Sequence, residues 1–430
     1  MTPDQTLFVA TSDLAGQLRG RSVPAAAADS ALQRGVGWVP ADLAITAFGT
    51  IAPNVFGSTG DLRLMPDATT RIEIPARGED PAVSLVLADQ TESDGSPWAC
   101  CPRTFARQAL DDLRTATGLE VTASFEHEFM AEGLPATAPF SFARHRSIEP
   151  FGSELVALLD ATGLQPENWL PEYGTDQFEI TLEPAPGLVA ADRAVLVKEL
   201  VRDLARRHGR AVTFAPLAHP DGSGNGVHVH LSLQTADGAP ALHDPSSPAG
   251  LSEVGRRFAA GVLAHAPALL AFTAPSPVSY LRLTPHRWSA GGVFLAERNR
   301  EALLRICPTS TAGGGDPARQ YNLEFRAADA TANPWLTLGL LVRAGLAGIT
   351  DELPDPVIWP ETVTEDELAG VPLLPKDLAA ALDELVADEV VTGWLDPALL
   401  DTHVSVKRAE LAAVAELSDV ERCARFADVY

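Results

Sequence analysis

The chain contains the stretch Phe125-Glu126-His127-Glu128-Phe129, in which two carboxylates lie between two phenylalanines. The flanking aromatic residues favour a β-strand, and residues two positions apart on a strand point to the same face. Glu126 and Glu128 therefore share one face and have no counter-charge beside them. Two carboxylates held this close need either a proton or a bound cation. This strand therefore offers metal ligands to one side of a sheet.

Two other short stretches repeat this spacing, and a longer one adds carboxylates. His228-Val229-His230 and Glu324-Phe325-Arg326 are flanked by apolar residues and also predict strands. The segment from Glu172 to Glu179 has a carboxylate at each end. Any one stretch alone is typical of a solvated strand edge. On one shared surface these side chains would repel each other unless cations lay among them, so together they predict a site for divalent metal and phosphate.

A glycine-rich segment, Asp221-Gly222-Ser223-Gly224-Asn225-Gly226, leads into the strand that carries the two histidines. Glycines let backbone N–H groups approach an anion closely. A turn into an ordinary strand is the alternative. It would explain the glycines, but it would not explain why His228, His230 and Ser232 alternate along the strand.

Arginines gather in the last third of this acidic chain. The formal net charge is −25, yet Arg298, Arg300, Arg305, Arg319 and Arg326 lie close together in sequence. A basic patch is usually a solvated face. Here it reverses the local sign of the charge, and arginine binds phosphate and carboxylate through two parallel hydrogen bonds. The cluster therefore favours an anion-binding surface.

The length and composition of the chain limit the class of protein to which it can belong. Its 430 residues suffice for two domains, and its charge argues against binding nucleic acid or an anionic membrane. The four cysteines lack metal-site spacing, and the first residues resemble no signal peptide, so we expect free thiols and a cytoplasmic protein. Short strands are predicted before residue 100 and an α+β pattern after it, with helices near 103–117, 190–208, 251–270, 331–349 and 376–391. Polar loops at 235–250 and 308–318 are candidate covers over a site.

Taken in order, these motifs resemble the glutamine synthetase superfamily over nearly the full length. Residues 60–67 resemble the end of the family's N-terminal β-grasp domain, and Asn333-Pro334-Trp335 follows the last catalytic motif. The resemblance implies a β-grasp domain at 1–99. It also implies a catalytic domain at 100–430, with a curved antiparallel sheet flanked by helices. Members activate glutamate as γ-glutamyl phosphate with ATP, and an amine then displaces the phosphate.

The resemblance also implies roles, position by position. One divalent ion, Mg²⁺ or Mn²⁺, would be held by Glu128, Glu172 and Glu179, and a second by Glu126, His228 and Glu324. Glutamate would be bound by Gly224, His230, Arg282 and Arg326, and ATP by Ser232, Arg300, Arg305 and Arg319. Arg282, Arg300 and Glu324 would be the catalytic residues. Family members form stacked rings, so a homododecamer of two hexameric rings is expected, with the neighbour's β-grasp domain completing each site.

The sequence departs from the ammonia-using members at the acceptor site. Those members place an Asp in the β-grasp domain and a Glu on the loop after the arginine that matches Arg282. Here residues 43–60 contain no acid, and Trp288 stands at the position of the Glu. An aromatic face can pack against an alkyl group or hold an alkylammonium. With His286 as a second pocket residue, this predicts an organic amine as acceptor, as in the γ-glutamylpolyamine, γ-glutamylethanolamide and γ-glutamylalkylamide synthetases.

Two alternatives stay open. The chain could be an ammonia-using glutamine synthetase with an unusual loop, or a catalytically silent homologue with a binding or structural role. A scaffold has no use for six unpaired metal ligands, which argues against the second alternative.

Overall fold

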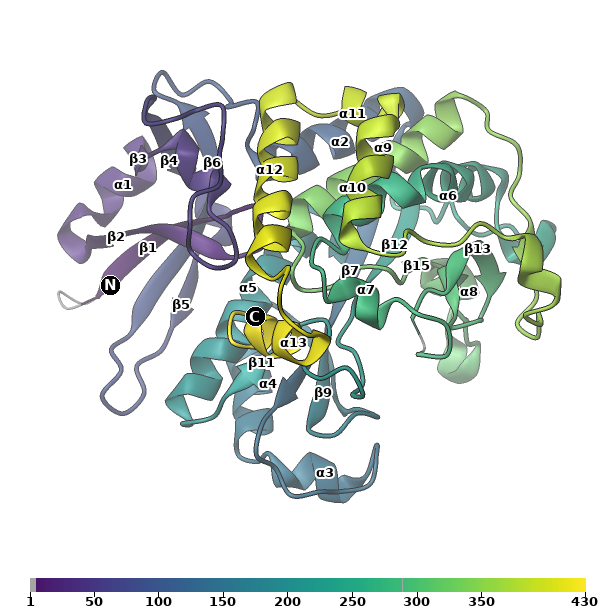
Figure 1. Cartoon of the computed structure of the whole chain (residues 1–430), viewed down its shortest axis with the longest axis horizontal. Coiled ribbons are helices and arrows are strands. Elements are labelled where there is room, and N and C mark those ends of the chain that lie inside the picture. Colours follow the sequence, from purple (N-terminus) through teal and green to yellow (C-terminus); the bar gives the residue numbers. More distant parts are fainter. Residues whose placement is uncertain (1–4, 288) are drawn as a thin grey trace.

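The computed structural model describes residues 5–287 and 289–430, which form two sheets with most helices around the larger one (Figure 1). The N-terminal sheet has the order β2-β1-β6-β4-β3, and β5 pairs with β6. Its strands are β1 (Thr6–Ser12), β2 (Leu18–Pro24), β3 (Val36–Trp38), β4 (Leu62–Pro66), β5 (Ile72–Ile74) and β6 (Val83–Glu92). A short helix, α1 (Ala28–Arg34), connects β2 to β3. The strands predicted from the sequence at 7–10, 61–65, 71–74 and 83–88 correspond to β1, β4, β5 and β6, whereas β2 and β3 were not predicted.

The second sheet has ten strands in the order β16-β13-β14-β15-β12-β7-β9-β8, with β10 and β11 also paired to β7. Its strands are β7 (Leu119–Ala131), β8 (Pro166–Pro171), β9 (Gln177–Leu182), β10 (Ala185–Pro186), β11 (Val212–Thr213), β12 (Val227–Thr235), β13 (Gly292–Glu297), β14 (Ala302–Ile306), β15 (Leu323–Phe325) and β16 (Ile358–Trp359). The sheet is antiparallel from β14 to β8, as expected, and β13 runs parallel to β14 and β16 at one edge.

The central strand β7 explains why the sequence folds this way locally. Phe125 and Phe129 are buried on its apolar face, where Phe129 packs within 6.5 Å of the rings of Phe151, Trp169, Phe178 and Phe214. Burying aromatic rings at alternate positions fixes the register of the strand. The carboxylates at 126 and 128 are thereby committed to the opposite face.

The expected helices are present, with one correction. They are α2 (Pro102–Thr117), α5 (Gly187–Arg207), α6 (Glu253–Thr273) and α9 (Pro334–Thr350). The helix predicted at 376–391 is instead two helices, α10 (Leu378–Ala387) and α11 (Glu389–Gly393). Asp388 separates them because its side chain accepts hydrogen bonds from the backbone N–H groups of Val390 and Val391, as an N-cap does. Besides α1, the unpredicted helices are α3 (Phe142–Ser147), α4 (Phe151–Ala161), α7 (Ser279–Arg282), α8 (Pro317–Gln320), α12 (Pro397–Ala413) and α13 (Asp419–Ala427).

The C-terminal segment joins the two parts of the molecule. In Figure 1, α12 lies between the N-terminal sheet and the rest of the chain. Glu410 on this helix accepts a hydrogen bond from the backbone N–H of Ala47 at 2.8 Å and pairs with buried Lys407 at 3.0 Å. The last residue, Tyr430, donates its hydroxyl to the carbonyl of Ala15 at 2.6 Å. The N-terminal sheet is thus fastened to the catalytic part by the far end of the chain.

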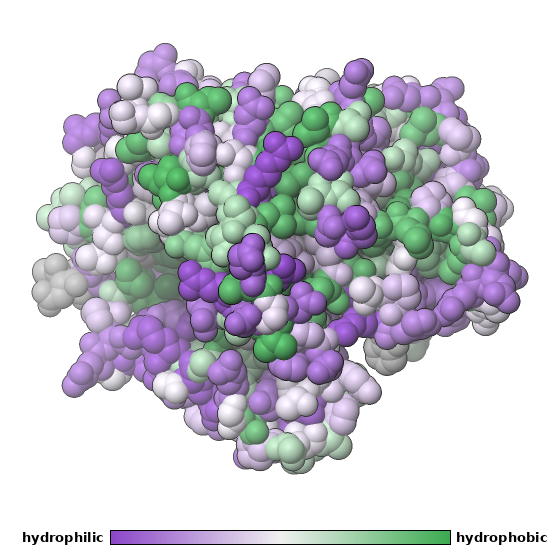
Figure 2. All heavy atoms as spheres, viewed as in Figure 1, coloured by the Kyte–Doolittle hydropathy of each residue, from purple (hydrophilic) through white to green (hydrophobic). Residues whose placement is uncertain are grey.

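Figure 2 shows a face on which hydrophilic and hydrophobic residues interleave. Within 5–287 and 289–430, no helix combines the length and apolar character needed to cross a bilayer.

Candidate active site

The large sheet aligns the predicted site residues across five neighbouring strands. His228 on β12 lies opposite Glu126 on β7, and Glu179 on β9 lies opposite Glu128. Glu324 on β15 lies opposite His230. Residues paired directly across an antiparallel sheet point to the same face. The row, from β14 to β9, is Arg305, Glu324, His230, His228, Glu126, Glu128 and Glu179.

One end of this row forms a compact ligand cluster. Oxygen and nitrogen atoms of Glu126, His230 and Glu324 lie within 4.8 Å of one another. His228 joins them, because its Nδ1 lies 3.4 Å from Glu126 Oε2 and 3.6 Å from Glu324 Oε1. The predicted trio of Glu126, His228 and Glu324 is therefore brought together. His230, predicted only as a glutamate contact, lies closer to Glu126 than His228 does, with its Nε2 at 3.1 Å from Oε1.

The charges in this cluster are matched. Burial opposes ionisation of Glu126, but His230 and His228 outweigh it and hold the pKa of that carboxyl well below its usual range. Burial likewise acts against ionised Glu324, and Arg326 with the two histidines nevertheless lowers its pKa to about 2. Both carboxylates are ionised at neutral pH, which is the state a divalent cation requires.

The other end of the row is a cluster of carboxylates with too little positive charge. Burial, with the neighbouring charge of Glu172 adding to it, raises the pKa of Glu128 to about 7. Burial and then the charges of Glu126, Glu128 and Glu172 raise the pKa of Glu179 well above its ordinary value. Burial also raises the pKa of Glu172. Three acids that oppose each other's ionisation at one place fit a divalent cation, whose charge would restore the ionised state. The donor set is all oxygen, which suits Mg²⁺ or Mn²⁺.

Two glycines on the approach to β12 make room for a buried arginine. A Cβ on Gly224 would lie 2.5 Å from Cγ of Arg282, and one on Gly226 would lie 2.7 Å from its Nη2. The backbone N–H of Gly226 donates to Oε2 of Glu128 at 2.6 Å. The expectation that these glycines open backbone N–H groups to an external anion is therefore wrong for Gly226, since its N–H already serves Glu128.

The arginines form a connected group behind the cluster. Arg282 is buried and donates through Nη2 to the carbonyls of Arg326 at 3.2 Å and Ala328 at 3.0 Å. Arg326 pairs with Glu324 and donates to the carbonyl of Arg300 at 2.9 Å. Arg305 binds the second oxygen of Glu324 at 2.7 Å. Glu324 is thus held between two guanidinium groups, so its orientation is fixed before any ligand arrives.

A cavity of about 410 Å³ opens beside the His230 end of the row. Ser232 and Arg319, both predicted to contact ATP, line it, and Ser232 donates to the carbonyl of Tyr321 at 3.0 Å. Gly238 and Ala318 also line it, so the two polar loops do border a cavity. Arg305 and Arg300 are not among its lining residues.

A second cavity, of about 500 Å³, lies beside Arg300. Its described lining residues are His286, Arg298, Asn299, Arg300, Glu301 and Glu361. Trp288, predicted to shape the amine pocket, lies outside the described residues. His286 lines this cavity; its backbone N–H donates to Glu301 at 3.2 Å, and its ring lies 3.2 Å from Glu365.

These acids were not predicted from the sequence. No acid lies between Arg282 and Glu297, whereas Glu301 and Glu361 reach the loop from other segments. For Glu301 a signal existed, because it directly follows Arg300. Cys307 was also missed, and its Sγ lies 3.7 Å from Nδ1 of His230 and 3.6 Å from a carboxylate oxygen of Glu324.

Comparison with known proteins identifies the class of protein that this sheet and its ligand row define. Residues 99–424 match the model of the glutamine synthetase catalytic domain, and residues 4–98 match that of the glutamine synthetase N-terminal domain. The chain belongs to the glutamine synthetase family, whose members are ATP- and metal-dependent ligases.

Several individual proteins are similar over most of their length. The γ-glutamylpolyamine synthetase GlnA3 of Streptomyces coelicolor is 35% identical over 96% of this chain and 91% of its own. The glutamine synthetase of Methanocaldococcus jannaschii is 31% identical over 81% of this chain and 79% of its own. Among solved structures, a novel glutamine synthase homologue covers 100% of this chain and 99% of its own at 45% identity, with a TM-score of 0.93. GmaS in complex with ADP covers 97% and 95% at 26% identity, with a TM-score of 0.83.

Proposed function

We propose that this chain joins the γ-carboxylate of glutamate to an organic amine in an ATP-dependent reaction that passes through γ-glutamyl phosphate. The observation that carries the proposal is the cavity beside Arg300, which has room for more than an ammonium ion. Its lining offers Glu301 and Glu361 as partners for a cationic amine. Similarity to a γ-glutamylpolyamine synthetase across nearly the whole chain supports the same acceptor class.

We propose that the ligand row holds two divalent ions. Glu128, Glu172 and Glu179 would hold one, and Glu126, His228 and Glu324 the other, with His230 close enough to serve as an additional ligand. When bound, these ions would neutralise the charge of the phosphoryl group in transfer.

The remaining predicted residues act on the substrates. The buried, pre-oriented Arg282 and Arg326 would bind the carboxylates of glutamate, beside Gly224 and His230. Ser232 and Arg319 line the cavity that we assign to ATP. Arg305 would act indirectly, by orienting Glu324 through their hydrogen bond. Arg300 would stabilise the phosphoryl group at the border with the amine cavity, consistent with its place in the lining.

The organisation of the molecule is proposed on the same basis. We assign residues 1–99 to the β-grasp domain and 100–430 to the catalytic domain of a cytoplasmic homododecamer of stacked hexameric rings. Ile51 and Val55, which are 58% and 60% exposed on a loop of the N-terminal part, suit a contact with a neighbouring subunit.

A phosphate-release assay with glutamate, ATP and a panel of acceptors tests the proposal. The panel contains ammonium, ethanolamine, putrescine and simple alkylamines. We expect an organic amine to give the highest kcat/KM. If ammonium exceeds every amine by a wide margin, the chain is an ammonia-using glutamine synthetase, the alternative favoured by its similarity to the archaeal enzyme.

A substitution tests the acceptor site directly. Trp288→Glu restores the acid that the ammonia-using members carry, so we expect the preference to shift toward ammonium. An unchanged ranking of the acceptors would contradict the role assigned to this loop.

A further inference from the structure

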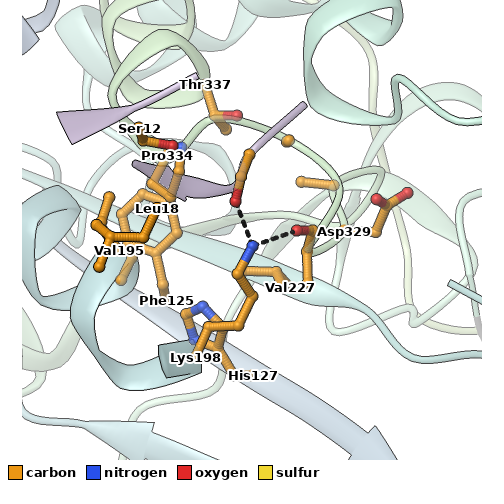
Figure 3. Close-up of a pocket in the computed structure, with 15 residues that line it drawn as sticks. Ser12, Leu18, Phe125, His127, Val195, Lys198, Val227, Asp329, Pro334 and Thr337 are labelled. Carbon is orange, nitrogen blue, oxygen red and sulfur yellow. Dashed lines mark hydrogen bonds between the residues drawn. The ribbon is translucent and has the colours of Figure 1, made fainter. Parts of the chain in front are cut away.

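A small cavity lies behind β7, on the face of the strand opposite to the acidic row (Figure 3). It has an accessible volume of about 20 Å³ and is formed where the N-terminal part meets the catalytic part. Ser12 and Gly16 come from the N-terminal part, His127 from β7, Lys198 from α5 and Thr337 from α9. Because His127 stands between Glu126 and Glu128 in sequence, this cavity backs directly onto the strand that carries the ligands.

Lys198 enters the cavity with an unusual set of partners. It is 5% exposed, and its ammonium donates to the carbonyls of Gly16 and, at 3.2 Å, of Ala330. Among the described residues, no carboxylate lies within ion-pair distance of its Nζ, and burial lowers its pKa to about 8. A buried lysine held by two carbonyls from distant segments ties those segments together, since its removal would leave both acceptors without a donor.

The first segment is the turn from Asp13 to Gln17, which is wedged into the catalytic part. Gly16 has a φ of +66°, and a Cβ on it would lie 2.6 Å from the carbonyl oxygen of Ala332. The side chain of Asn333 donates to the carbonyls of Ser12 at 3.3 Å and Asp13 at 3.1 Å. The turn therefore has no room to move relative to residues 330–333.

The second segment directly follows Arg326 and accepts hydrogen bonds from Arg282. The carbonyl of Ala328, two residues before the one that Lys198 binds, accepts from Arg282 at 3.0 Å and from the backbone N–H of Val227 at 3.0 Å. The carbonyl of Arg326 also accepts from Arg282. Lys198 and Arg282 thus bind carbonyls of the same stretch, residues 326–330; Lys198 does so from the domain junction, and Arg282 from beside Gly224 and Gly226.

Three side-chain atoms of residues that line the cavity lack a hydrogen-bond partner. They are Nδ1 of His127, Oδ2 of Asp329 and Oγ1 of Thr337, which are buried and have no hydrogen-bond partner within the described part of the chain. A polar cavity of this size accommodates about one water molecule, which needs at least two such partners. The lining is suitable for water and too small for a substrate.

We propose that Lys198 is a positioning residue. It locks the turn Asp13–Gln17 against residues 327–333 around one buried water, and so sets the Arg282–Arg326 pair that receives glutamate. The part of this inference that concerns glutamate rests on the proposed function, whereas the lock itself rests on the contacts alone.

Two readouts test the lock. In Lys198→Met, we expect amide hydrogen exchange of residues 327–333 to accelerate about tenfold, because an anchoring bond is lost. We expect the KM for glutamate to rise about tenfold while the KM for ATP changes less than about twofold, because only the arginine pair is displaced. Unchanged exchange, or equal changes in the two KM values, would overturn the inference.

Lys407→Met is the matched control. Lys407 is also fully buried near the domain junction, but its partner is Glu410 and it does not contact residues 327–333. We expect it to lower thermal stability and to leave both the exchange of that segment and the KM for glutamate unchanged. If it reproduces the effects of Lys198→Met, those effects come from general destabilisation and the positioning role is wrong.

Further variants keep the test decisive. Lys198→Gln retains a donor, so we expect a smaller rise in exchange and in the KM for glutamate; it replaces Lys198→Met if that variant does not fold. Thr337→Val keeps the side-chain shape and removes the hydroxyl that faces the water, so unchanged exchange in it would exclude the water. If the unmodified chain releases no phosphate, the proposed function fails, and hydrogen exchange alone decides whether Lys198 forms the lock.

Discussion

At the scale of single residues, the two ends of the ligand row differ in how much positive charge surrounds their carboxyl groups. The cluster of Glu126 and Glu324 is compensated by histidines and arginines, whereas Glu128 and Glu179 resist ionisation. The uncompensated end has the most to gain from a cation, because bound positive charge would remove the mutual repulsion of its acids. Its ligands should therefore be the most sensitive to substitution.

Glu128→Ala is expected to abolish phosphoryl transfer. The change removes a carboxylate of the uncompensated cluster and the acceptor of the Gly226 N–H, so we expect glutamate-dependent phosphate release to fall by about a thousandfold or more. Glu120→Ala, on the same strand but outside the row, is the control and should retain activity. Substantial activity of Glu128→Ala at the Mg²⁺ concentration that suffices for the unmodified chain would contradict a direct role of Glu128 in metal binding.

Glu301 is expected to select between acceptors. Glu301→Gln removes a charge that lines the amine cavity, so we expect kcat/KM for putrescine to fall about tenfold and that for a simple alkylamine to fall less than about threefold. The second ammonium of the diamine would lose a partner that a monoamine never uses. Glu297→Gln is the control, because Glu297 pairs with Arg298 but is not among the described residues lining this cavity. An equal loss for both amines would mean that Glu301 only supports the backbone of His286.

At the scale of the elements, strand periodicity made most of the ligand row predictable. The period of two assigned Glu126 and Glu128 to one face from sequence alone, and the same rule applied to β12. The register between strands was not predictable, because it depends on packing such as that of Phe129 against distant rings. That is why the proximity of His230 to Glu126 became apparent only in the structure.

Contacts between segments far apart in the chain also could not be predicted from local sequence patterns. Glu301 lies in the connection between the parallel strands β13 and β14, and Glu361 follows β16, which pairs with β13; both thereby line the same cavity as His286. The break between α10 and α11, by contrast, could have been predicted from a local sequence signal. Its signal, an Asp at 388 before an apolar run, was present in the sequence and was outweighed by helical periodicity.

The helix α12 carries a histidine whose charge state should affect stability. His403 is buried, donates through Nε2 to the carbonyl of Ala271 at 2.8 Å, and stacks on Phe272 at 3.9 Å. Burial, with Lys407 nearby, lowers the pKa of His403 to about 3. The folded state therefore rejects a proton that the unfolded chain accepts below its ordinary pKa of about 6.5. The stability contributed by neutral His403 is complete above that value and is lost as the pH falls toward 3.

His403→Phe should separate this effect from general acid denaturation. At pH 7.5 we expect the variant to be less stable, because the hydrogen bond to Ala271 is lost. From pH 6.5 to pH 5 its deficit in the free energy of unfolding should narrow by about 2 kcal/mol, since each pH unit is worth about 1.4 kcal/mol for one proton. Denaturant titrations of the unmodified chain and the variant across this pH range measure the difference between their free energies of unfolding. A difference that does not change with pH would show that His403 is not held neutral.

At the scale of the whole molecule, the N-terminal part and the C-terminal residue both support the site from behind. The wedged turn near Gly16, the hydroxyl of Tyr430 and the contact between Glu410 and Ala47 bring segments from both ends of the chain together. The carboxyl groups on the Glu179 side of the ligand row have too little positive charge around them to ionise readily. Binding of cations and nucleotide should therefore stabilise the entire folded chain.

Addition of Mg²⁺ and ATP to the metal-free protein is expected to raise its melting temperature. A ligand at a hundred times its Kd stabilises the folded state by about 2.7 kcal/mol when the unfolded chain does not bind it. Mg²⁺ alone should give part of the shift, because it relieves the repulsion among Glu128, Glu172 and Glu179. A chelator should reverse it, and Glu128→Ala should show little of it. A catalytically silent scaffold would keep the same melting temperature throughout, so this measurement separates the ligase from that alternative without depending on which amine is the acceptor.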